Sequence, residues 1–137
     1  MSEWGSIASL VKDVHSKKRP ATELVKKSLK TIADNEDFRA IISTTEARAL
    51  ERAAEIDTRL ARGEDVGRLA GVPFIAKDNF LAYGADTTAA SNILKGFEAP
   101  YQATAIELLE AEGAICVAKA NLDAFAHGSS TENSDFF

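Results

Sequence analysis

The sequence is poor in the residues that build disulfides and zinc sites. It has one cysteine, Cys116, which excludes an internal disulfide. Two histidines and one cysteine are too few for the usual His and Cys ligand set, so we expect no metal in this chain. Cys116 lies in the apolar run 114–118, and we interpret it as a small buried side chain rather than a reactive thiol.

Signals for membranes, secretion and nucleotides are also missing. No apolar run approaches the roughly 20 residues that span a bilayer, and the first ten residues lack the basic start and apolar stretch of a secretion signal. We therefore expect a cytoplasmic protein that does not contact a membrane. The sequence contains neither a G-x-G-x-x-G nor a Walker A string, so we expect no nucleotide site in this segment.

The charge balance argues against direct nucleic-acid binding. The net charge is −5, and the one basic cluster, Lys17-Lys18-Arg19, is too short to form a binding patch. A mildly acidic chain can still serve an RNA-handling assembly when a partner makes the phosphate contacts. The length of 137 residues suits one modest domain or a piece of a larger core.

Two helices are predicted near the N-terminus because apolar residues recur there at three- and four-residue steps. Pro20 is suited to the first turn of the second helix, since its missing N–H costs nothing there. The two apolar stripes consist of Trp4, Ile7, Val11 and Val14, and of Leu24, Val25, Leu29 and Ile32.

Three short apolar runs predict strands, at 38–42, 72–76 and 114–118. Helical patterns separate them, and this alternation is typical of an α/β fold in which crossovers favour parallel strands. Residues 83–100 have no clean period and are interpreted as an irregular loop.

Two Ser/Thr-x-x-Glu strings predict where the later helices begin. Ser43 and Glu46 form the first possible capping box, before a helix that reaches about Arg62. Thr104 and Glu107 form the second. Glycines at positions 63 and 113 are suited to end these helices in the left-handed conformation.

Lys77 is the first candidate for chemistry. It follows the apolar run 72–76 and is followed by Asp78 and Asn79, so its amine points beyond the end of a strand. In open α/β sheets ligands bind at that edge, and a partly buried amine loses proton affinity and can act as a base. The alternative, favoured by position alone, is a lysine whose stem covers apolar surface while its head stays in water.

The second candidate is the run from Gly128 through Ser129 and Ser130 to Thr131, with His127 beside it. Glycine lets the backbone approach a ligand closely, and hydroxyls and amides can bind a polar substrate. A hydroxyl-rich turn is the alternative for this run. His127 could act as an acid or base, or it could be structural.

Three segments together resemble the amidase-signature family, and within it the A subunits of the Glu-tRNA(Gln)/Asp-tRNA(Asn) amidotransferases. The resemblance covers nearly the whole chain. The G-V-P-x-x-x-K-D-N pattern is shared by many amidases, whereas the N-L-D-A-F-A-H-G-S-S-T-E-N-S block favours the A subunits. The segments are residues 69–79, 87–91 and 118–134.

The resemblance implies an α/β fold with a mixed sheet flanked by helices, of which this chain is an incomplete N-terminal part. Residues 1–36 would be a helical lead-in, and 37–137 would start the α/β core. The family uses a Ser–cis-Ser–Lys triad whose lysine matches Lys77, neutral at rest. Its substrate-pocket border matches the five residues Ala126, His127, Gly128, Ser129 and Ser130.

The implied activity is glutamine hydrolysis that supplies ammonia for tRNA-dependent amidation. The implied partners are the B and C subunits of the amidotransferase, glutamine, and misacylated tRNA bound through the B subunit. No cofactor is expected in this chain, whereas ATP and magnesium are expected on the B subunit.

This sequence departs from the family pattern in two ways. The two serines of the triad belong to a Gly/Ser-rich segment that follows residue 134 in the family, so we expect this chain to be a piece of a longer enzyme and inactive alone. Most A subunits carry methionine where His127 stands. Two alternatives stay open: a piece of a general small-amide amidase, and a non-catalytic remnant that binds a partner.

Overall fold

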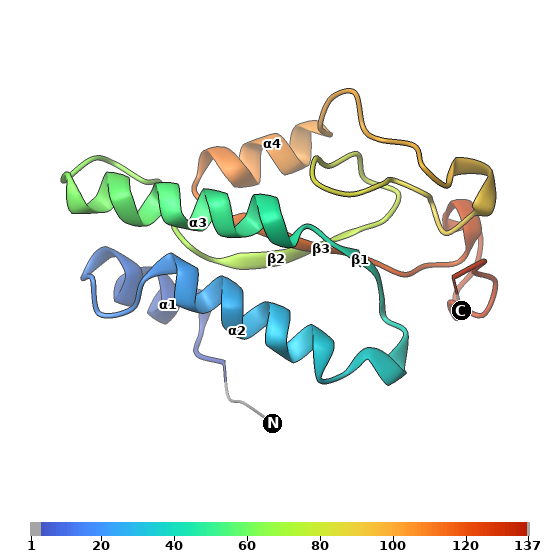
Figure 1. Cartoon of the computed structure of the whole chain (residues 1–137), viewed down its shortest axis with the longest axis horizontal. Helices are drawn as coiled ribbons and strands as arrows, with labels where there is room; N and C mark the ends of the chain where they lie inside the picture. The colour runs from blue at the N-terminus through green and yellow to red at the C-terminus, as the bar shows by residue number, and fades with distance from the viewer. Residues whose placement is uncertain (1–3, 137) are drawn as a thin grey trace.

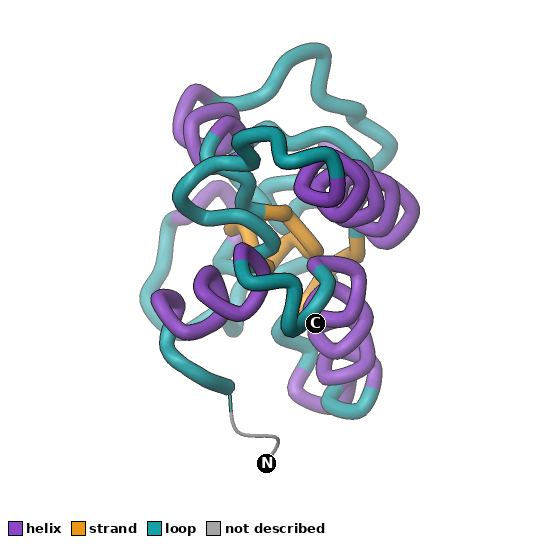
Figure 2. Tube along the Cα trace, turned by 90° about the vertical axis from the view of Figure 1, so that its left-hand side faces the viewer, coloured by secondary structure: helices purple, strands orange, loops and turns teal. Residues whose placement is uncertain are grey.

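A three-stranded mixed sheet lies at the centre of the molecule, and helices surround it (Figure 1 and Figure 2). The computed structural model describes residues 4–136. The strand order is β1-β3-β2, with β3 parallel to β2 and antiparallel to β1, so the predicted mixed sheet is confirmed. The elements in chain order are α1 (Ile7–His15), α2 (Ala21–Ala33), β1 (Ile41–Thr44), α3 (Glu46–Ala61), β2 (Pro73–Lys77), α4 (Thr104–Ala111) and β3 (Ile115–Ala120).

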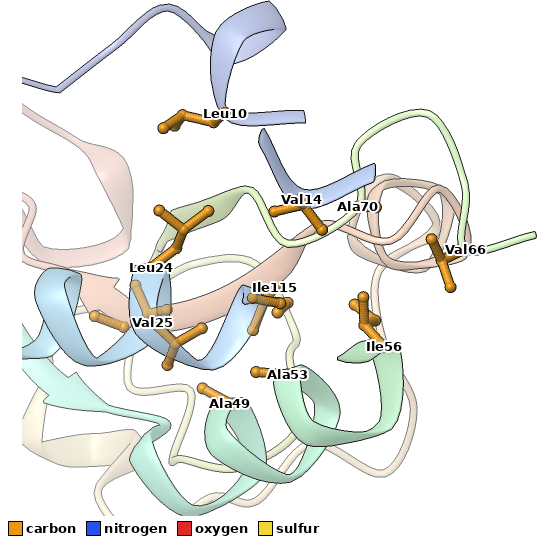
Figure 3. Close-up of a cluster of buried hydrophobic side chains, with 13 residues drawn as sticks. Leu10, Val14, Leu24, Val25, Ala49, Ala53, Ile56, Val66, Ala70 and Ile115 are labelled. Atoms are coloured by element: carbon orange, nitrogen blue, oxygen red, sulfur yellow. The ribbon is translucent and has the colours of Figure 1, made fainter. Parts of the chain in front are cut away.

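The central strand β3 is buried on both faces. Ile115 and Val117 join the main apolar cluster with residues of α1, α2 and α3, including Leu24 of α2 (Figure 3). Cys116 faces the other way and packs with Ile106 of α4 in a smaller cluster. This arrangement follows from the alternation of side chains along a strand. Each large apolar side chain buried in this way contributes about 1.5–3 kcal/mol.

The first strand begins later than predicted. Residues Glu36–Phe38 form a short 3-10 turn, η1, and Phe38 is 77% exposed. Arg39 then adopts a left-handed φ of 49°, which redirects the chain before β1 starts at Ile41. The other two predicted strands are confirmed, with boundaries shifted by one or two residues toward the C-terminus.

Neither predicted capping box forms. Thr45 precedes α3, and its hydroxyl donates a 2.7 Å hydrogen bond to the carbonyl of Cys116 instead of capping the helix. Ser43 lies within β1, paired with Lys119, and so it cannot cap α3. Ala103 precedes α4 and has no side-chain oxygen to cap it. The helix starts were close to the predicted residues. Pairing with β3 engages Ser43 of the first box, whereas Thr104 of the second box is itself the first residue of α4.

Gly113 ends α4 where the chain makes a close approach. Its φ is +87°, and a Cβ on it would lie 2.2 Å from the carbonyl oxygen of Val66. We expect Gly113→Ala to lower the free energy of unfolding by about 2–5 kcal/mol, from left-handed strain plus overpacking. Gly63→Ala is the control: its φ is +76° with open space around it, so only about 1–2 kcal/mol is expected. Urea unfolding of both variants tests this, and equal losses would contradict it.

Residues 4–136 contain neither a membrane-spanning helix nor a metal-binding group. None of these helices is long and apolar enough to cross a membrane. No three His, Cys, Asp or Glu side chains in this range come together in a way that could hold a metal ion.

Candidate active site

The carboxyl ends of β2 and β3 form the edge on which the candidate site is built. The two strands are parallel, so both end on the same side, and Lys77 pairs with Ala120 at that end. The N–H of Asp78 continues the ladder by donating to the carbonyl of Ala120 at 3.0 Å. Lys77 therefore lies at the strand end that the sequence predicted.

Lys77 and Asp78 have opposite environments. Lys77 is exposed within residues 4–136. Asp78 is fully buried. Successive side chains at a strand end point to opposite faces, which explains how one lysine can stay accessible while its neighbour is enclosed.

A buried ion pair lies directly behind Lys77. The Nζ of Lys119 is 2.7 Å from Oδ1 of Asp78, and both side chains are 0% exposed. Oδ2 of Asp78 accepts hydrogen bonds from the N–H of Thr88, at 3.0 Å, and from its hydroxyl. Lys119 also donates to the hydroxyl of Thr87 at 3.0 Å. Sequence reasoning missed this network, although a charged residue near the end of each of two apolar runs was a visible signal.

The loop 86–91 connects this ion pair to the C-terminal segment 123–135. The N–H of Ala89 donates to the carbonyl of Asp78 at 3.0 Å, and the carbonyl of Ala89 accepts from the N–H of Phe125 at 2.9 Å. The carbonyl of Ala90 accepts from the N–H of Asp135 at 3.1 Å. In Figure 1 the C-terminal segment, in red, lies at the same end of the molecule as the yellow-to-gold part of the loop between β2 and α4.

Asp123 organises the predicted substrate-border segment. Its carboxylate accepts from the N–H groups of Thr131, at 2.9 Å, of Asn133, at 3.0 Å, and of Ser130, at 3.1 Å. These hydrogen bonds lower the pKa of Asp123, with Thr131 contributing most, and the positive charge of Lys77 lowers it further.

The five predicted border residues lie together at this edge. Ala126 ends the short turn η3 (Ala124–Ala126) with a left-handed φ of 61°, and His127, Gly128, Ser129 and Ser130 are exposed. The hydroxyl of Ser130 donates to Glu132 at 2.8 Å. The exposed members of this run are available to a ligand.

Gly128 has a steric reason to be glycine. A Cβ at this position would lie 2.5 Å from a carboxylate oxygen of Asp123. The backbone of the border segment therefore approaches the carboxylate more closely than a larger residue would allow. The sequence analysis predicted that this glycine allows a ligand to approach the backbone. In this structure the nearby carboxylate of Asp123 leaves no room for a larger residue at position 128.

We expect Asp123→Ala to loosen the border segment without unfolding the sheet. The change removes the acceptor of three N–H groups, and hydrogen bonds to a charged group are worth about 1.5–3 kcal/mol. Amide hydrogen exchange at Thr131 and Asn133 should therefore accelerate by about 10–100-fold. Asp65→Ala is the control, because Asp65 accepts a local bond from the N–H of Gly67 in a different loop. Unchanged exchange at Thr131 would contradict the role of Asp123.

The same carboxylate predicts a pH dependence of local order. Because the folded-state pKa of Asp123 is lowered, its stabilisation is fully present above the ordinary aspartate value of about 3.9 and is lost as the pH falls through the lower folded value. The amide NMR signals of Thr131 and Asn133 should therefore show the loss of these hydrogen bonds as the pH falls below about 4. Asp123→Ala should remove this transition.

Comparison with known proteins gives a consistent result. The sequence matches the Amidase family over residues 23–137. It is 51% identical over 134 residues to the A subunit of Glutamyl-tRNA(Gln) amidotransferase of Limosilactobacillus reuteri (strain DSM 20016), covering 96% of this chain and 27% of the relative. It is 47% identical over 133 residues to the protein of the same name from Thermosynechococcus vestitus, covering 93% of this chain and 28% of the relative.

A solved structure shows the same arrangement of the backbone. The native peptide amidase of Stenotrophomonas maltophilia superposes with a TM-score of 0.84 at 32% sequence identity, over 89% of this chain and 26% of the amidase chain. This chain thus spans about a quarter of the length of the proteins it matches, and its fold is part of a larger amidase domain. On the match over residues 23–137, the chain belongs to the amidase family.

Proposed function

We propose that this chain carries the catalytic lysine of a glutaminase, as part of the A subunit of a tRNA-dependent amidotransferase. The observation that carries the proposal is the position of Lys77, which is exposed at the carboxyl end of β2 and pairs with the last residue of β3, the strand that leads into the border segment. The high identity to two relatives named as such subunits supports the choice within the family.

In the proposed reaction Lys77 is the general base of a Ser–cis-Ser–Lys triad. Its neutral amine accepts a proton through the bridging serine, and the nucleophilic serine attacks the amide carbonyl of glutamine. Collapse of the adduct transfers a proton to the leaving nitrogen, releases ammonia and leaves an acyl-enzyme. Water then hydrolyses the ester and releases glutamate. We propose that the two serines come from sequence beyond residue 137, and that the same sequence covers Lys77 and desolvates its amine.

The remaining parts of the proposal concern the border segment and the assembly. Ala126, His127, Gly128, Ser129 and Ser130 would border the glutamine pocket, since they lie on the same sheet edge as Lys77. The B and C subunits would be partners in the cytoplasm. The B subunit would hold misacylated tRNA, ATP and magnesium, and would consume the ammonia.

The test is ammonia release by the full-length protein in complex with its B and C partners. Glutamine should be hydrolysed in preference to simple aliphatic amides, and the rate should respond to the partner subunits. The 137-residue chain alone should release no ammonia. Release by this chain that disappears in Lys77→Ala would overturn the proposal that further residues complete the site.

A second candidate is hydrolysis of peptide or other small amides without partners. The similarity to peptide amidase, at 32% identity and a TM-score of 0.84, favours it. It predicts that the full-length protein hydrolyses peptide amides without partners, and that added B and C subunits leave the rate unchanged. The same substrate panel therefore separates the two functions.

A further inference from the structure

The buried ion pair behind Lys77 connects the two parts of the candidate site. We propose that Asp78 and Lys119 form a positioning unit that holds the segment 123–135 in register with Lys77, acting through Thr88 and the loop 86–91. This inference rests on the proposed function, because it gives the ion pair a role at the glutaminase site.

A continuous series of hydrogen bonds connects the Asp78–Lys119 pair to the segment 123–135. Asp78 receives two hydrogen bonds from Thr88, and the hydroxyl of Thr88 also accepts from the N–H of Ala90 at 3.1 Å. The carbonyl of Ala90 then accepts from the N–H of Asp135, and that of Ala89 from the N–H of Phe125. Lys119 holds the start of the same loop through Thr87.

A second contact joins the chain just after the loop 86–91 to the segment 123–135. The carboxylate of Asp135 accepts from the N–H of Asn92 at 2.7 Å, at the start of the 3-10 turn η2 (Asn92–Leu94). Asp135 therefore bonds to this region through both its backbone and its side chain. The segment 123–135 therefore contacts this region at two residues, Phe125 and Asp135.

Backbone strain is concentrated where the loop meets the segment. Ala89, Ala90, Phe125 and Ala126 all have φ between +50° and +61°, although none is glycine. A left-handed residue that is not glycine is strained and persists only where the surroundings fix it. The network around Asp78 is the described structure that fixes the loop side of this contact.

A buried ion pair is a poor way to gain stability alone. Replacing such pairs by apolar residues of similar volume is often neutral or stabilising, because desolvation offsets the attraction of the charges. The directional bonds that Asp78 makes to Thr88 and that Lys119 makes to Thr87 are what an apolar replacement could not provide. The pair is thus better explained by positioning than by stability.

The test uses the titration of Asp123, which touches neither member of the pair. Thr88→Val keeps the ion pair and the side-chain shape but removes the hydroxyl between Asp78 and Ala90. We expect the NMR-measured pKa of Asp123 to rise toward its ordinary value, and exchange at Thr131 and Asn133 to accelerate at least tenfold. Thr88→Ser restores the hydroxyl and should restore both readouts.

A double variant removes the charges while keeping the volume. Asp78→Asn with Lys119→Met leaves an acceptor for Thr88 but none of the bonds from Lys119, and it should shift both readouts in the same direction. The control removes a partly buried pair elsewhere, Arg48→Met with Glu110→Gln, where the native atoms are 2.6 Å apart. This control should lower stability and leave Asp123 unchanged.

The outcomes separate the inference from the proposed function. Folded Thr88→Val and double variants with unchanged Asp123 titration and amide exchange would overturn the positioning role. A native chain whose Asp123 titrates at the ordinary value would overturn it as well. Absence of glutaminase activity in the assembled full-length protein would contradict the proposed function. It would not change the NMR results that test the positioning role.

Discussion

Replacing Lys77 by methionine in the assembled full-length enzyme is expected to lower kcat for glutamine hydrolysis by about 10²–10⁴-fold, the usual contribution of a general base. Methionine keeps the length and the apolar stem of the side chain but cannot accept a proton. Because Lys77 is exposed in residues 4–136 and lies at a strand end, its removal should change the free energy of unfolding of this part little. Loss of activity without loss of stability is the signature of a chemical role.

Two further variants make this prediction specific. Lys77→Arg keeps the positive charge, but guanidinium stays protonated and cannot act as a base, so it should be as inactive as methionine. Lys95→Met removes another exposed lysine, outside the candidate site, and should leave kcat unchanged. Initial rates of ammonia release measure all three. An active Lys77→Arg variant would show that the residue supplies charge and not a proton acceptor.

The fold was predictable from the sequence wherever a single local pattern determined the secondary structure. Strands β2 and β3 follow from short apolar runs, and their parallel pairing follows from the helical patterns between the runs. β1 was misplaced because Phe38 extends an apolar run in sequence but turns outward in the 3-10 turn. Apolar character alone does not distinguish a strand from a turn that exposes its aromatic residue.

The prediction of the first capping box failed for a tertiary reason. A Ser-x-x-Glu string describes only the helix start, whereas Thr45 and Ser43 are engaged by β3, more than 70 residues away in sequence. The hydroxyl of Thr45 gains more by satisfying a buried carbonyl than by capping a helix end that can be solvated. No local sequence pattern indicates whether the hydroxyl of Thr45 will cap the helix or bind the distant carbonyl.

The site was predicted only in part. Lys77 and the border segment were predicted from motifs; Lys77 ends β2 beside the end of β3, and the border segment follows β3, while their roles stay predictions. Lys119 was overlooked because a lysine near the end of an apolar run is usually solvated at its head. Its burial depends on the loop 86–91, which the sequence shows only as an aperiodic stretch. A buried charged residue can be recognised in a sequence only when the residue of opposite charge that pairs with it can also be identified.

Removing one member of the buried pair should have the largest effect on stability. Lys119→Met leaves the carboxylate of Asp78 enclosed without its cation, and breaking a buried ion pair in this way costs about 3–5 kcal/mol. Asp78→Asn should cost a similar amount, because it leaves the ammonium of Lys119 enclosed instead. Urea unfolding of the 137-residue chain measures both losses.

The double variant Asp78→Asn with Lys119→Met should recover most of this loss, since it leaves no buried charge unpaired. The two single losses would then add up to far more than the loss in the double variant, which is the coupling expected of residues in direct contact. Additive losses would mean that the charges do not interact. A double variant that is stable, yet lets the border segment 123–135 move freely, would show that the pair determines position, whereas the apolar core around β3 determines stability.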